Sequence, residues 1–226
     1  MSVENFFRFD KFFDSNILAA SSFKDISATR IDLAELIGYS KDSIAIPYQT
    51  HSINVIYIDT PGQFENCDGL ITNNSDILLS LQTADCIPIF FYDMISGVYG
   101  LVHAGWRGVI NNIVDKSIKV MTQHKALPKD IKVLIGPSIC KKCFEVGVEV
   151  ARLFDKRCIT KNKALKYFAN LQYQVTLQLL YNNIMKSNIF FSNICSFENQ
   201  RCCSFRRDKM HAGRMYSFMG IKNGLC

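Results

Sequence analysis

The segment Leu101-Val102-His103-Ala104-Gly105-Trp106-Arg107-Gly108 joins two patterns that together indicate the fold class. The apolar run that ends in it predicts a strand over 97–103. Along 108–123, apolar side chains recur at three- and four-residue steps while polar ones fill the opposite face, which is typical of an amphipathic helix. A strand and a helix therefore follow each other here, with only a short turn between them.

His103, one of four histidines in the chain, stands at the junction of these two patterns. Gly105 ends the strand, so His103 is expected at a strand end beside a helix N-terminus. Exposed backbone N–H groups at such a terminus favour an anion, and Arg107 is expected at the same place. This position is more typical of a functional site than of a core.

Further apolar runs bounded by Gly, Asn and Asp predict additional strands. They cover 52–58, 69–72, 78–92 in one or two pieces, 131–135, 189–194 and 215–221. Weaker helical patterns cover 145–156 and 176–187. Neighbouring strands within 78–103 are expected to pair antiparallel, and strands separated by helices imply crossovers. We therefore expect an α+β fold (mixed α/β), with mixed β-sheets flanked by helices. Without linkers or repeats, it should form a single domain over 1–226.

Composition and charge restrict the class of partner. The formal net charge of +6 is mild, and the densest basic stretch, 201–214, also contains Asp208. Nucleic-acid binding would need basic residues gathered on one face, so we expect no nucleic-acid partner.

No apolar run approaches the ~20 residues of a membrane span, so no membrane association is expected. Charged residues interrupt the phenylalanines of 1–16, which argues against a signal peptide and favours a cytoplasmic protein. No protein partner is predicted.

The nine cysteines form an irregular set. They occupy positions 67, 86, 140, 143, 158, 195, 202, 203 and 226. Without a signal peptide, free thiols in a reducing compartment are expected rather than a disulfide framework.

Three residues offer a ligand set for zinc: His51 in "YQTHSINV", Cys86 in "LQTADC" and His103. Each is expected at a strand end. Two imidazoles and one thiolate can bind Zn²⁺ and leave a fourth position open, as catalytic zinc sites do. The separations of 35 and 17 residues match no local rule. Two alternatives remain: Cys86 as a buried structural thiol, or as a nucleophile with His103 as its base.

Cys140 and Cys143 form a C-x₂-C pair after "GPSI", as in zinc nucleoside deaminases. That signature also needs H-x-E, and here Gly105 stands where the glutamate would be. No second C-x₂-C completes a structural zinc site, so we interpret this pair as lying outside the functional site. We expect His124 to cap the helix over 108–123, and His211 has no evident partner. Glycine-rich phosphate-binding motifs are absent from the sequence.

Six motifs occur in the order found in the YfiH-like family, which the chain resembles from about 44 to 220. They are "YQTHSINV", "DGLITN", "LQTADCIPIFFYD", "GLVHAGWRG", "IGPSICKKCFEVG" and "SFRRDKMHAGR". "TADC-x-P" and "HAGWRG" are highly specific. These proteins, long called polyphenol oxidases or laccase-domain proteins, are now described as purine nucleoside phosphorylases with adenosine deaminase activity. Their fold is described as similar to that of cysteine hydrolases.

The resemblance implies a bound zinc, with His51, Cys86 and His103 as its ligands. It implies phosphorolysis of adenosine, inosine, guanosine or methylthioadenosine to free base and ribose 1-phosphate, together with adenosine deamination. The chain departs from the family pattern at Phe144, where tyrosine is usual, and at Cys202 and Cys203, where aromatics are usual. The older laccase name fits the composition poorly, since multicopper oxidases need clustered histidines and this chain has four in all.

We expect His51, Cys86, His103 and Arg107 to carry catalysis. Arg107 and the turn around it are our first candidates for binding phosphate. Arg206 and Arg207 are second candidates, with Arg214 beside them and structural ion pairs as their alternative role. Asp85 is expected to orient a ligand or to cap a turn.

Two other functions remain as alternatives at this stage. One is a peptidoglycan-editing hydrolase that removes serine from a muramyl nucleotide, as described for some bacterial relatives. The other is a non-catalytic protein that binds zinc or purines.

Overall fold

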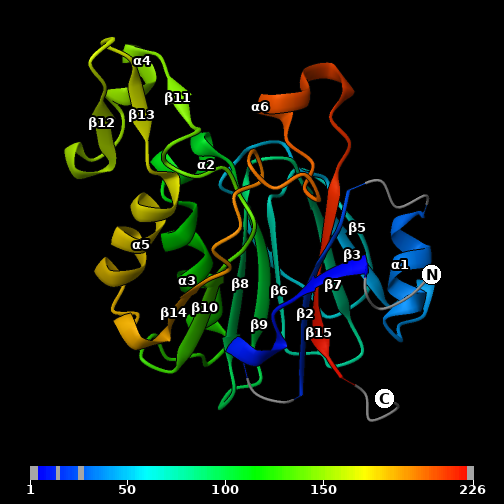
Figure 1. Cartoon of the computed structure of the whole chain (residues 1–226). Helices are drawn as coiled ribbons and strands as arrows, with labels where there is room; N and C mark the ends of the chain where they lie inside the picture. The colour runs from blue at the N-terminus through cyan, green and yellow to red at the C-terminus, as the bar shows by residue number, and fades with distance from the viewer. Residues whose placement is uncertain (1–4, 14–15, 25–27, 223–226) are drawn as a thin grey trace.

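Two mixed sheets lie face to face between layers of helices in the computed structural model, which describes residues 5–13, 16–24 and 28–222 (Figure 1). Helix α1 (Arg30–Leu36) packs on the outer face of the first sheet, where its Leu33 joins Leu78 and Phe218 in one buried cluster. Helices α3 (Ile113–Gln123) and α5 (Leu171–Tyr181) cover the outer face of the second sheet. The layers therefore run helix, sheet, sheet, helix.

The first sheet has six strands and mixed direction. In spatial order they are β1 (Phe6–Arg8), β2 (Ile17–Ser22), β15 (Met215–Ile221), β7 (Leu78–Thr83), β3 (Ile44–Pro47) and β5 (Gly62–Phe64). The β7–β3 and β3–β5 pairs are parallel, and the other pairs are antiparallel.

The second sheet also has six strands. In spatial order they are β14 (Ile189–Phe191), β10 (Ile131–Ile135), β8 (Ile87–Asp93), β9 (Tyr99–Ala104), β6 (Gly69–Thr72) and β4 (Val55–Tyr57). The two outermost pairs are parallel, and the three inner pairs are antiparallel. The α+β class with mixed sheets and flanking helices is thereby confirmed.

The remaining elements are short. A three-stranded sheet consists of β11 (Glu145–Val146), β13 (Tyr167–Ala169) and β12 (Ile159–Lys161). The other helices are α2 (Trp106–Ile110), α4 (Val148–Ala151) and α6 (Phe205–Asp208). Single 3₁₀ turns cover Asp10–Phe12, Lys41–Ser43, Lys156–Cys158, Lys186–Asn188 and Lys209–His211. Within the described residues, none of the helices has the length and apolar character needed to cross a membrane.

Strand β8 is buried along its whole length because both of its faces are covered. Ile89 faces α3 and α5, whereas Phe90 faces the first sheet. A strand covered on both faces consists of continuous apolar residues rather than alternating ones. This explains why the pattern over 78–92 predicts strand without showing which side chains face which layer.

The strands β7 and β8 differ from the predicted arrangement. We expected the neighbouring strands of 78–103 to pair, and β8 does pair antiparallel with β9. However, β7 belongs to the first sheet and β8 to the second, so the chain crosses between sheets at 84–86. The prediction of β7–β8 pairing is wrong because β7 pairs with β15 and β3 instead.

The helix predictions over 108–123 and 145–156 need correction, and the helix predicted over 176–187 lies earlier in the sequence. The helix predicted over 108–123 is broken, since α2 ends before Asn112, which adopts a left-handed φ of 65°. Asparagine tolerates this conformation better than most residues. The range 145–156 contains β11 and the short α4, and the helix predicted over 176–187 is α5, which begins earlier at Leu171. The single domain over 1–226 stays a prediction.

Candidate metal centre

The structure brings together the three residues that the sequence grouped. His51 lies in the loop between β3 and β4, Cys86 directly precedes β8, and His103 lies near the end of β9. Their ligand atoms all lie within 4.8 Å of one another. Cys86 Sγ is 4.0 Å from His51 Nε2, and the two imidazole rings meet edge to face with centroids 4.9 Å apart.

Asp68, which immediately precedes β6, holds both histidines in place. Its buried carboxylate accepts a hydrogen bond from His103 Nδ1 at 2.7 Å and one from the backbone N–H of His51 at 3.0 Å. The same carboxylate accepts from the backbone N–H and the hydroxyl of Ser52, at 2.6 and 2.7 Å. Since an ionised carboxylate only accepts, His103 Nδ1 must carry a proton, so Nε2 is the ring nitrogen that can bind a metal once its own proton is lost.

Sequence reasoning did not assign a role to Asp68, although it belongs to the quoted motif "DGLITN". The signal that could have identified it is a carboxylate placed directly before a buried strand. An aspartate buried in this way needs several donors, and the loop of His51 supplies them. Its position 17 residues after His51 and 35 before His103 gives no local clue.

The crossing between the two sheets sets the position of Cys86. Asp85 adopts a left-handed φ of 85°, and its backbone carbonyl accepts a hydrogen bond from Ile139 N–H at 3.0 Å. Its carboxylate accepts from Ser196 Oγ and from Arg206 N–H, both at 2.6 Å. Asp85 therefore fixes the crossing to the C-terminal segment. Of the two roles expected for it, this is closer to capping a turn than to orienting a ligand imidazole.

Burial and charge act in opposite directions on the titrating groups of this centre. Burial alone would raise the pKa of Cys86, but the charge of His103 and hydrogen bonds from both imidazoles lower it to about 6. Burial alone would lower the pKa of His103, but the Cys86 thiolate and Asp68 raise it to about 9. Burial would raise the pKa of Asp68, yet hydrogen bonds from His103 and Ser52 lower it to about 2. Without metal, the centre is therefore a thiolate–imidazolium–carboxylate array.

Gly105 is required by close approach rather than by its backbone conformation. A Cβ at this position would lie 2.8 Å from His51 Cδ2 and 3.3 Å from Cys86 Sγ. Any larger residue would displace the ligand side chains. The glycine that distinguishes this chain from H-x-E deaminases is thus part of the packing of the centre.

A cavity of about 540 Å³ opens over the centre. Its walls include the aromatic residues Trp106, Phe144 and Phe205 and the cationic residues Arg107, Arg206, Lys209 and Arg214. This volume lies in the range of roughly 300–1,000 Å³ that is typical of small-molecule sites. The anion site expected at a helix N-terminus is weaker than predicted, because the helix that begins here, α2, has only five residues. Cationic side chains supply the positive charge of this cavity instead.

The arginines predicted as substrate-binding residues differ in their surroundings. Arg107 lies over the ring of Trp106, with its guanidinium carbon 4.5 Å from the ring centroid. Arg206 lines the same cavity and donates to the backbone carbonyl of Glu145 at 2.6 Å. Arg207 is not among the residues that line the cavity. Its guanidinium donates to the carbonyls of Ser196, Phe197 and Cys202 and pairs with Asp208, which is the structural role kept as its alternative.

The other two histidines lie outside the centre. His124 follows the last residue of α3, as predicted, and its ring stacks on Tyr57 with centroids 3.4 Å apart. His211 is exposed in the turn after α6. These four histidines do not form the clustered imidazole sites that a multicopper oxidase needs.

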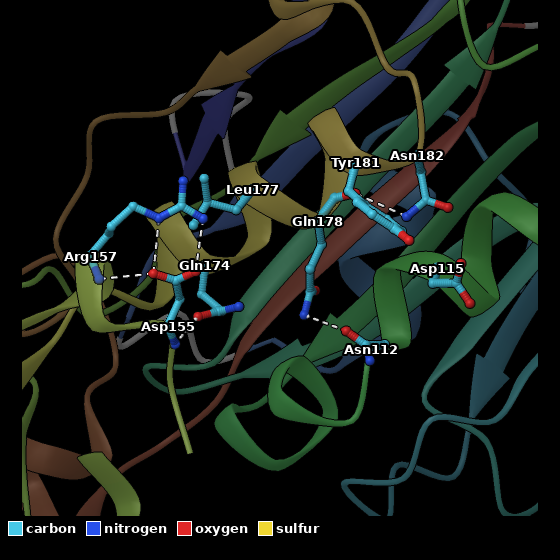
Figure 2. A pocket seen from close by; sticks show the side chains of 9 residues that line it. All are labelled: Asn112, Asp115, Asp155, Arg157, Gln174, Leu177, Gln178, Tyr181 and Asn182. Carbon is cyan, nitrogen blue, oxygen red and sulfur yellow. Dashed lines mark hydrogen bonds and ion pairs between the residues drawn. The ribbon is translucent and has the colours of Figure 1, made fainter. Parts of the chain in front are cut away.

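A different cavity, of about 410 Å³, lies between α3, α5 and the turn at Asp155–Arg157 (Figure 2). Arg157 is paired with Asp155 through two hydrogen bonds, at 2.8 and 2.9 Å. Gln178 donates to Asn112 across the cavity at 2.9 Å. None of its lining residues is a histidine or a cysteine, and its arginine is already paired with Asp155. It is therefore a weaker candidate for a reactive site than the cavity over Cys86.

Comparison with known proteins places the chain in a family. The family model described as "Multi-copper polyphenol oxidoreductase laccase" matches residues 16–222. The chain belongs to this laccase-like family. The crystal structure of YlmD from Geobacillus stearothermophilus superimposes with a TM-score of 0.88 and 25% identity, covering 99% of this chain and 98% of that one. The YfiH protein of Bacillus licheniformis, at 22% identity, has the same fold with a TM-score of 0.85 over 96% and 97% of the two chains. The resemblance to YfiH-like proteins is thereby confirmed.

Two curated relatives of this laccase-like chain carry enzyme names. A protein of Deinococcus radiodurans named purine nucleoside phosphorylase is 30% identical over 199 residues, covering 88% of this chain and 78% of that protein. Adenosine deaminase RL5, from an unknown prokaryotic organism, is 33% identical over 210 residues, covering 85% and 79%.

Proposed function

We propose that the chain is a zinc-dependent purine nucleoside enzyme. It cleaves adenosine, inosine, guanosine and methylthioadenosine by phosphorolysis, giving the free base and ribose 1-phosphate, or the 5-methylthio derivative of that sugar phosphate from methylthioadenosine, and it also deaminates adenosine. The observation that carries this proposal is the convergence of His51, Cys86 and His103 at the floor of a cavity of nucleoside size. The names of the two curated relatives, which describe both reactions, support it.

The donor set fits zinc. A thiolate and two imidazole nitrogens are ligands that Zn²⁺ favours, and three protein ligands leave a coordination position free. The low pKa of Cys86 means that its sulfur is already deprotonated near neutral pH. Asp68 orients His103 in the manner of the carboxylate–histidine pairs that support many zinc sites. Zinc bound there supplies Lewis-acid activation of water or of a substrate oxygen.

Cationic side chains around the cavity bind phosphate. Arg107, Arg206 and Arg214 line it, and guanidinium groups match phosphate oxygens in geometry and charge. Arg206 donates to the carbonyl of Glu145, whereas the Arg107 guanidinium lies over the ring of Trp106. In phosphorolysis, a phosphate oxygen bonds to C1′ of the ribose while the bond from C1′ to the base nitrogen breaks. These arginines orient phosphate for that attack.

Aromatic walls bind the purine. Trp106, Phe144 and Phe205 line the cavity, and flat rings of this kind stack on heterocyclic bases. In deamination, water adds at C6 of adenosine and ammonia leaves. Stacking on these rings would hold C6 within reach of the centre.

The ligand variants test this proposal. We expect Cys86→Ala and His103→Ala to lose the zinc of this centre and to lose phosphorolysis and deamination together. His124→Ala serves as a matched control, because it removes a histidine outside the centre. Metal analysis and chromatography of adenosine incubations measure both properties. Full phosphorolysis by a Cys86→Ala or His103→Ala protein without metal in the centre would overturn the proposal.

The same incubations distinguish the alternative functions. Release of serine from a muramyl nucleotide, with nucleosides unchanged, would identify a peptidoglycan-editing hydrolase and overturn the proposal. Purine binding without turnover of nucleoside, phosphate or muramyl substrate would identify a binding protein and would also overturn it.

A further inference from the structure

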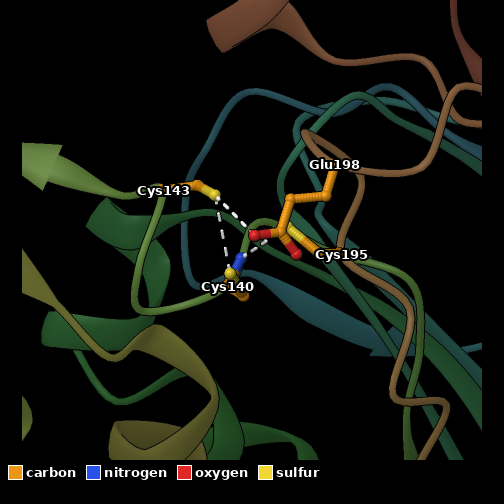
Figure 3. Close-up of side chains that lie close together, drawn as sticks. All are labelled: Cys140, Cys143, Cys195 and Glu198. Carbon is orange, nitrogen blue, oxygen red and sulfur yellow. Dashed lines mark hydrogen bonds between the residues drawn. The ribbon is translucent and has the colours of Figure 1, made fainter.

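A second group of metal-binding side chains lies outside the His51 centre. Cys140, Cys143, Cys195 and Glu198 bring three sulfur atoms and a carboxylate oxygen within 4.8 Å of one another. Figure 3 shows these side chains pointing toward a common point from two separate loops. The sequence alone gave no partner for the C-x₂-C pair, and the interpretation of Cys140 and Cys143 as unconnected residues is corrected by this arrangement.

The topology of the second sheet brings the two loops together. Strands β10 and β14 are parallel neighbours, so they end at the same edge of the sheet. The loop after β10 carries Cys140 and Cys143, and the loop after β14 carries Cys195 and Glu198. A backbone bridge between Ser138 and Cys195 continues the parallel pairing beyond the strands. The four side chains are therefore positioned by regular backbone pairing.

The distances within the group match a tetrahedral metal site. Cys140 Sγ lies 3.6 Å from Cys143 Sγ, and Cys143 Sγ lies 3.6 Å from Glu198 Oε1. A disulfide would bring two sulfurs to about 2.05 Å. Tetrahedral zinc, with Zn–S near 2.3 Å and Zn–O near 2.0 Å, separates two sulfurs by about 3.8 Å and a sulfur and an oxygen by about 3.5 Å. The observed spacings agree with the metal site and not with the disulfide.

The backbone around the sulfurs also fits metal ligation. Cys143 N–H donates to the carbonyl of Cys140 at 3.0 Å, which closes the C-x₂-C turn. Cys140 N–H donates to Cys195 Sγ at 3.4 Å, which links the two loops directly at this sulfur. Cys195 and Glu198 form a second pair three residues apart, with a carboxylate in place of the second thiolate. A search for two C-x₂-C pairs misses this combination.

Two lysines balance the charge of the group. Three thiolates and a carboxylate around a divalent cation leave a net negative charge. Lys141 and Lys142 lie between the first two cysteines and border the same shallow cavity as Cys140, Cys195 and Glu198. Their ammonium groups offset this charge, which reduces the repulsion among the ligands.

We infer that Cys140, Cys143, Cys195 and Glu198 bind a structural zinc ion that joins the loop after β10 to the loop after β14. Four protein ligands fill the tetrahedron, so no position remains for substrate, as in structural zinc sites. Both loops continue into the wall of the cavity over Cys86. Phe144 follows Cys143 directly, and Ser196 donates to Asp85 at 2.6 Å. The ion would therefore stabilise one wall of that cavity.

Metal analysis of single variants tests this inference. Protein produced with zinc and purified under reducing conditions is expected to contain about two zinc ions per chain. We expect Cys86→Ala to retain about one zinc ion, whose X-ray absorption spectrum shows three sulfur ligands and one lighter ligand. Cys143→Ser should also retain about one, now in the histidine centre. Cys158→Ala, a buried cysteine outside both groups, is the matched control and should retain both.

Several results would overturn the inference. Among them are a Cys86→Ala protein without zinc, a Cys143→Ser protein with unchanged zinc content, and a disulfide between Cys140 and Cys143 in the reduced preparation. Glu198→Gln, which leaves all thiolates in place, guards against misfolding as an explanation and should release zinc to a chelator faster than wild type. Equal release rates would also contradict the inference. Activity is not a readout here, so failure of the proposed enzyme function would be seen separately.

Discussion

A single buried carboxylate, Asp68, organises the candidate centre. It fixes the imidazole of His103 through one oxygen and the loop of His51 through both. Because the same group positions two of the three predicted ligands, it couples their geometry. A carboxylate in this position acts through the ligands and does not itself face the cavity.

We expect Asp68→Asn to weaken zinc binding to the histidine centre by roughly 10- to 100-fold, the usual range for lost support of a ligand histidine. An amide could still accept from Ser52, but it cannot stabilise the charge on His103. Competition with a chromophoric zinc chelator measures the affinity. Asp76→Asn, an exposed change, should leave the affinity at the wild-type value. Equal affinities for the two variants would show that Asp68 does not support the centre.

The thiol of Cys86 should titrate well below an ordinary cysteine in the metal-free protein. Its pKa of about 6 means that the thiolate forms as the pH rises through 6, whereas an unperturbed thiol requires about 8.5. Alkylation of the apoprotein with iodoacetamide, followed by peptide mass mapping, should therefore show a midpoint near pH 6 at this residue. His103→Ala removes the main stabilising charge and should move the midpoint upward. A midpoint near 8.5 in the wild type would contradict this electrostatic description.

For individual residues, the sequence predicted the candidate metal ligands but not the side chains that hold them in position. His51, Cys86 and His103 could be grouped because thiolates and imidazoles are unusual at strand ends. Asp68 could not be distinguished from the chain's other carboxylates, because its importance depends on donors from a loop that precedes it by 16 to 18 residues. Arg207 resembled Arg206 in sequence, and only the structure shows which carbonyls occupy its guanidinium.

At the scale of elements, the crossing at 84–86 is the feature that places Cys86 at the boundary between the sheets. Strand β7 ends in the first sheet, and β8 begins in the second. The two strands were predicted from one apolar run. Their assignment to different sheets depends on pairing with β15 and β9, which local sequence patterns do not contain.

The break between α2 and α3 is stabilised from α5. Gln178 Nε2 donates to the carbonyl of Val109 at 2.6 Å and to Asn112 Oδ1 at 2.9 Å. The amphipathic pattern of 108–123 continues through the break, so it predicted one helix. The sequence pattern could not predict the break, because the acceptors at the break are satisfied by Gln178, a buried amide of a helix that is distant in sequence.

We expect Gln178→Ala to lower the free energy of unfolding by ~1–3 kcal/mol, because buried polar groups lose their partner. Urea denaturation monitored by circular dichroism measures this change. Gln123→Ala, at the exposed end of α3, should change stability by less than about 0.5 kcal/mol. A Gln178→Ala protein as stable as the wild type would show that the break does not depend on this side chain.

Short elements account for most of what the sequence did not predict. Strands such as β11, β12 and β13 have two or three residues, which is too short for a periodic pattern to be recognised. Apolar strands inside the second sheet were predicted at their true bounds, as with β10 and β6. A strand buried on both faces has a continuous apolar sequence that is easily recognised, whereas a short surface strand forms only because a neighbouring strand pairs with it.

At the scale of the whole molecule, strand ends from both sheets meet around one cavity. The loops after β3 and β7 and the end of β9 supply the histidine centre, and the segments after β10 and β14 supply the cysteine cluster and one wall of the cavity. Family membership is shown by the match over 16–222. The chemistry suggested by the name of that family requires clustered histidines, but only two of the four histidines in this chain, His51 and His103, lie together, in a candidate centre that also contains Cys86.

We propose that this centre serves purine nucleoside chemistry. The most direct measurement is chromatography of adenosine incubated with the zinc-loaded protein, with and without phosphate. We expect adenine and ribose 1-phosphate only when phosphate is present, and inosine or its product hypoxanthine from deamination. His103→Ala should give none of these products. Unchanged adenosine, inosine and guanosine after incubation with folded, zinc-loaded wild-type protein and phosphate would contradict this activity.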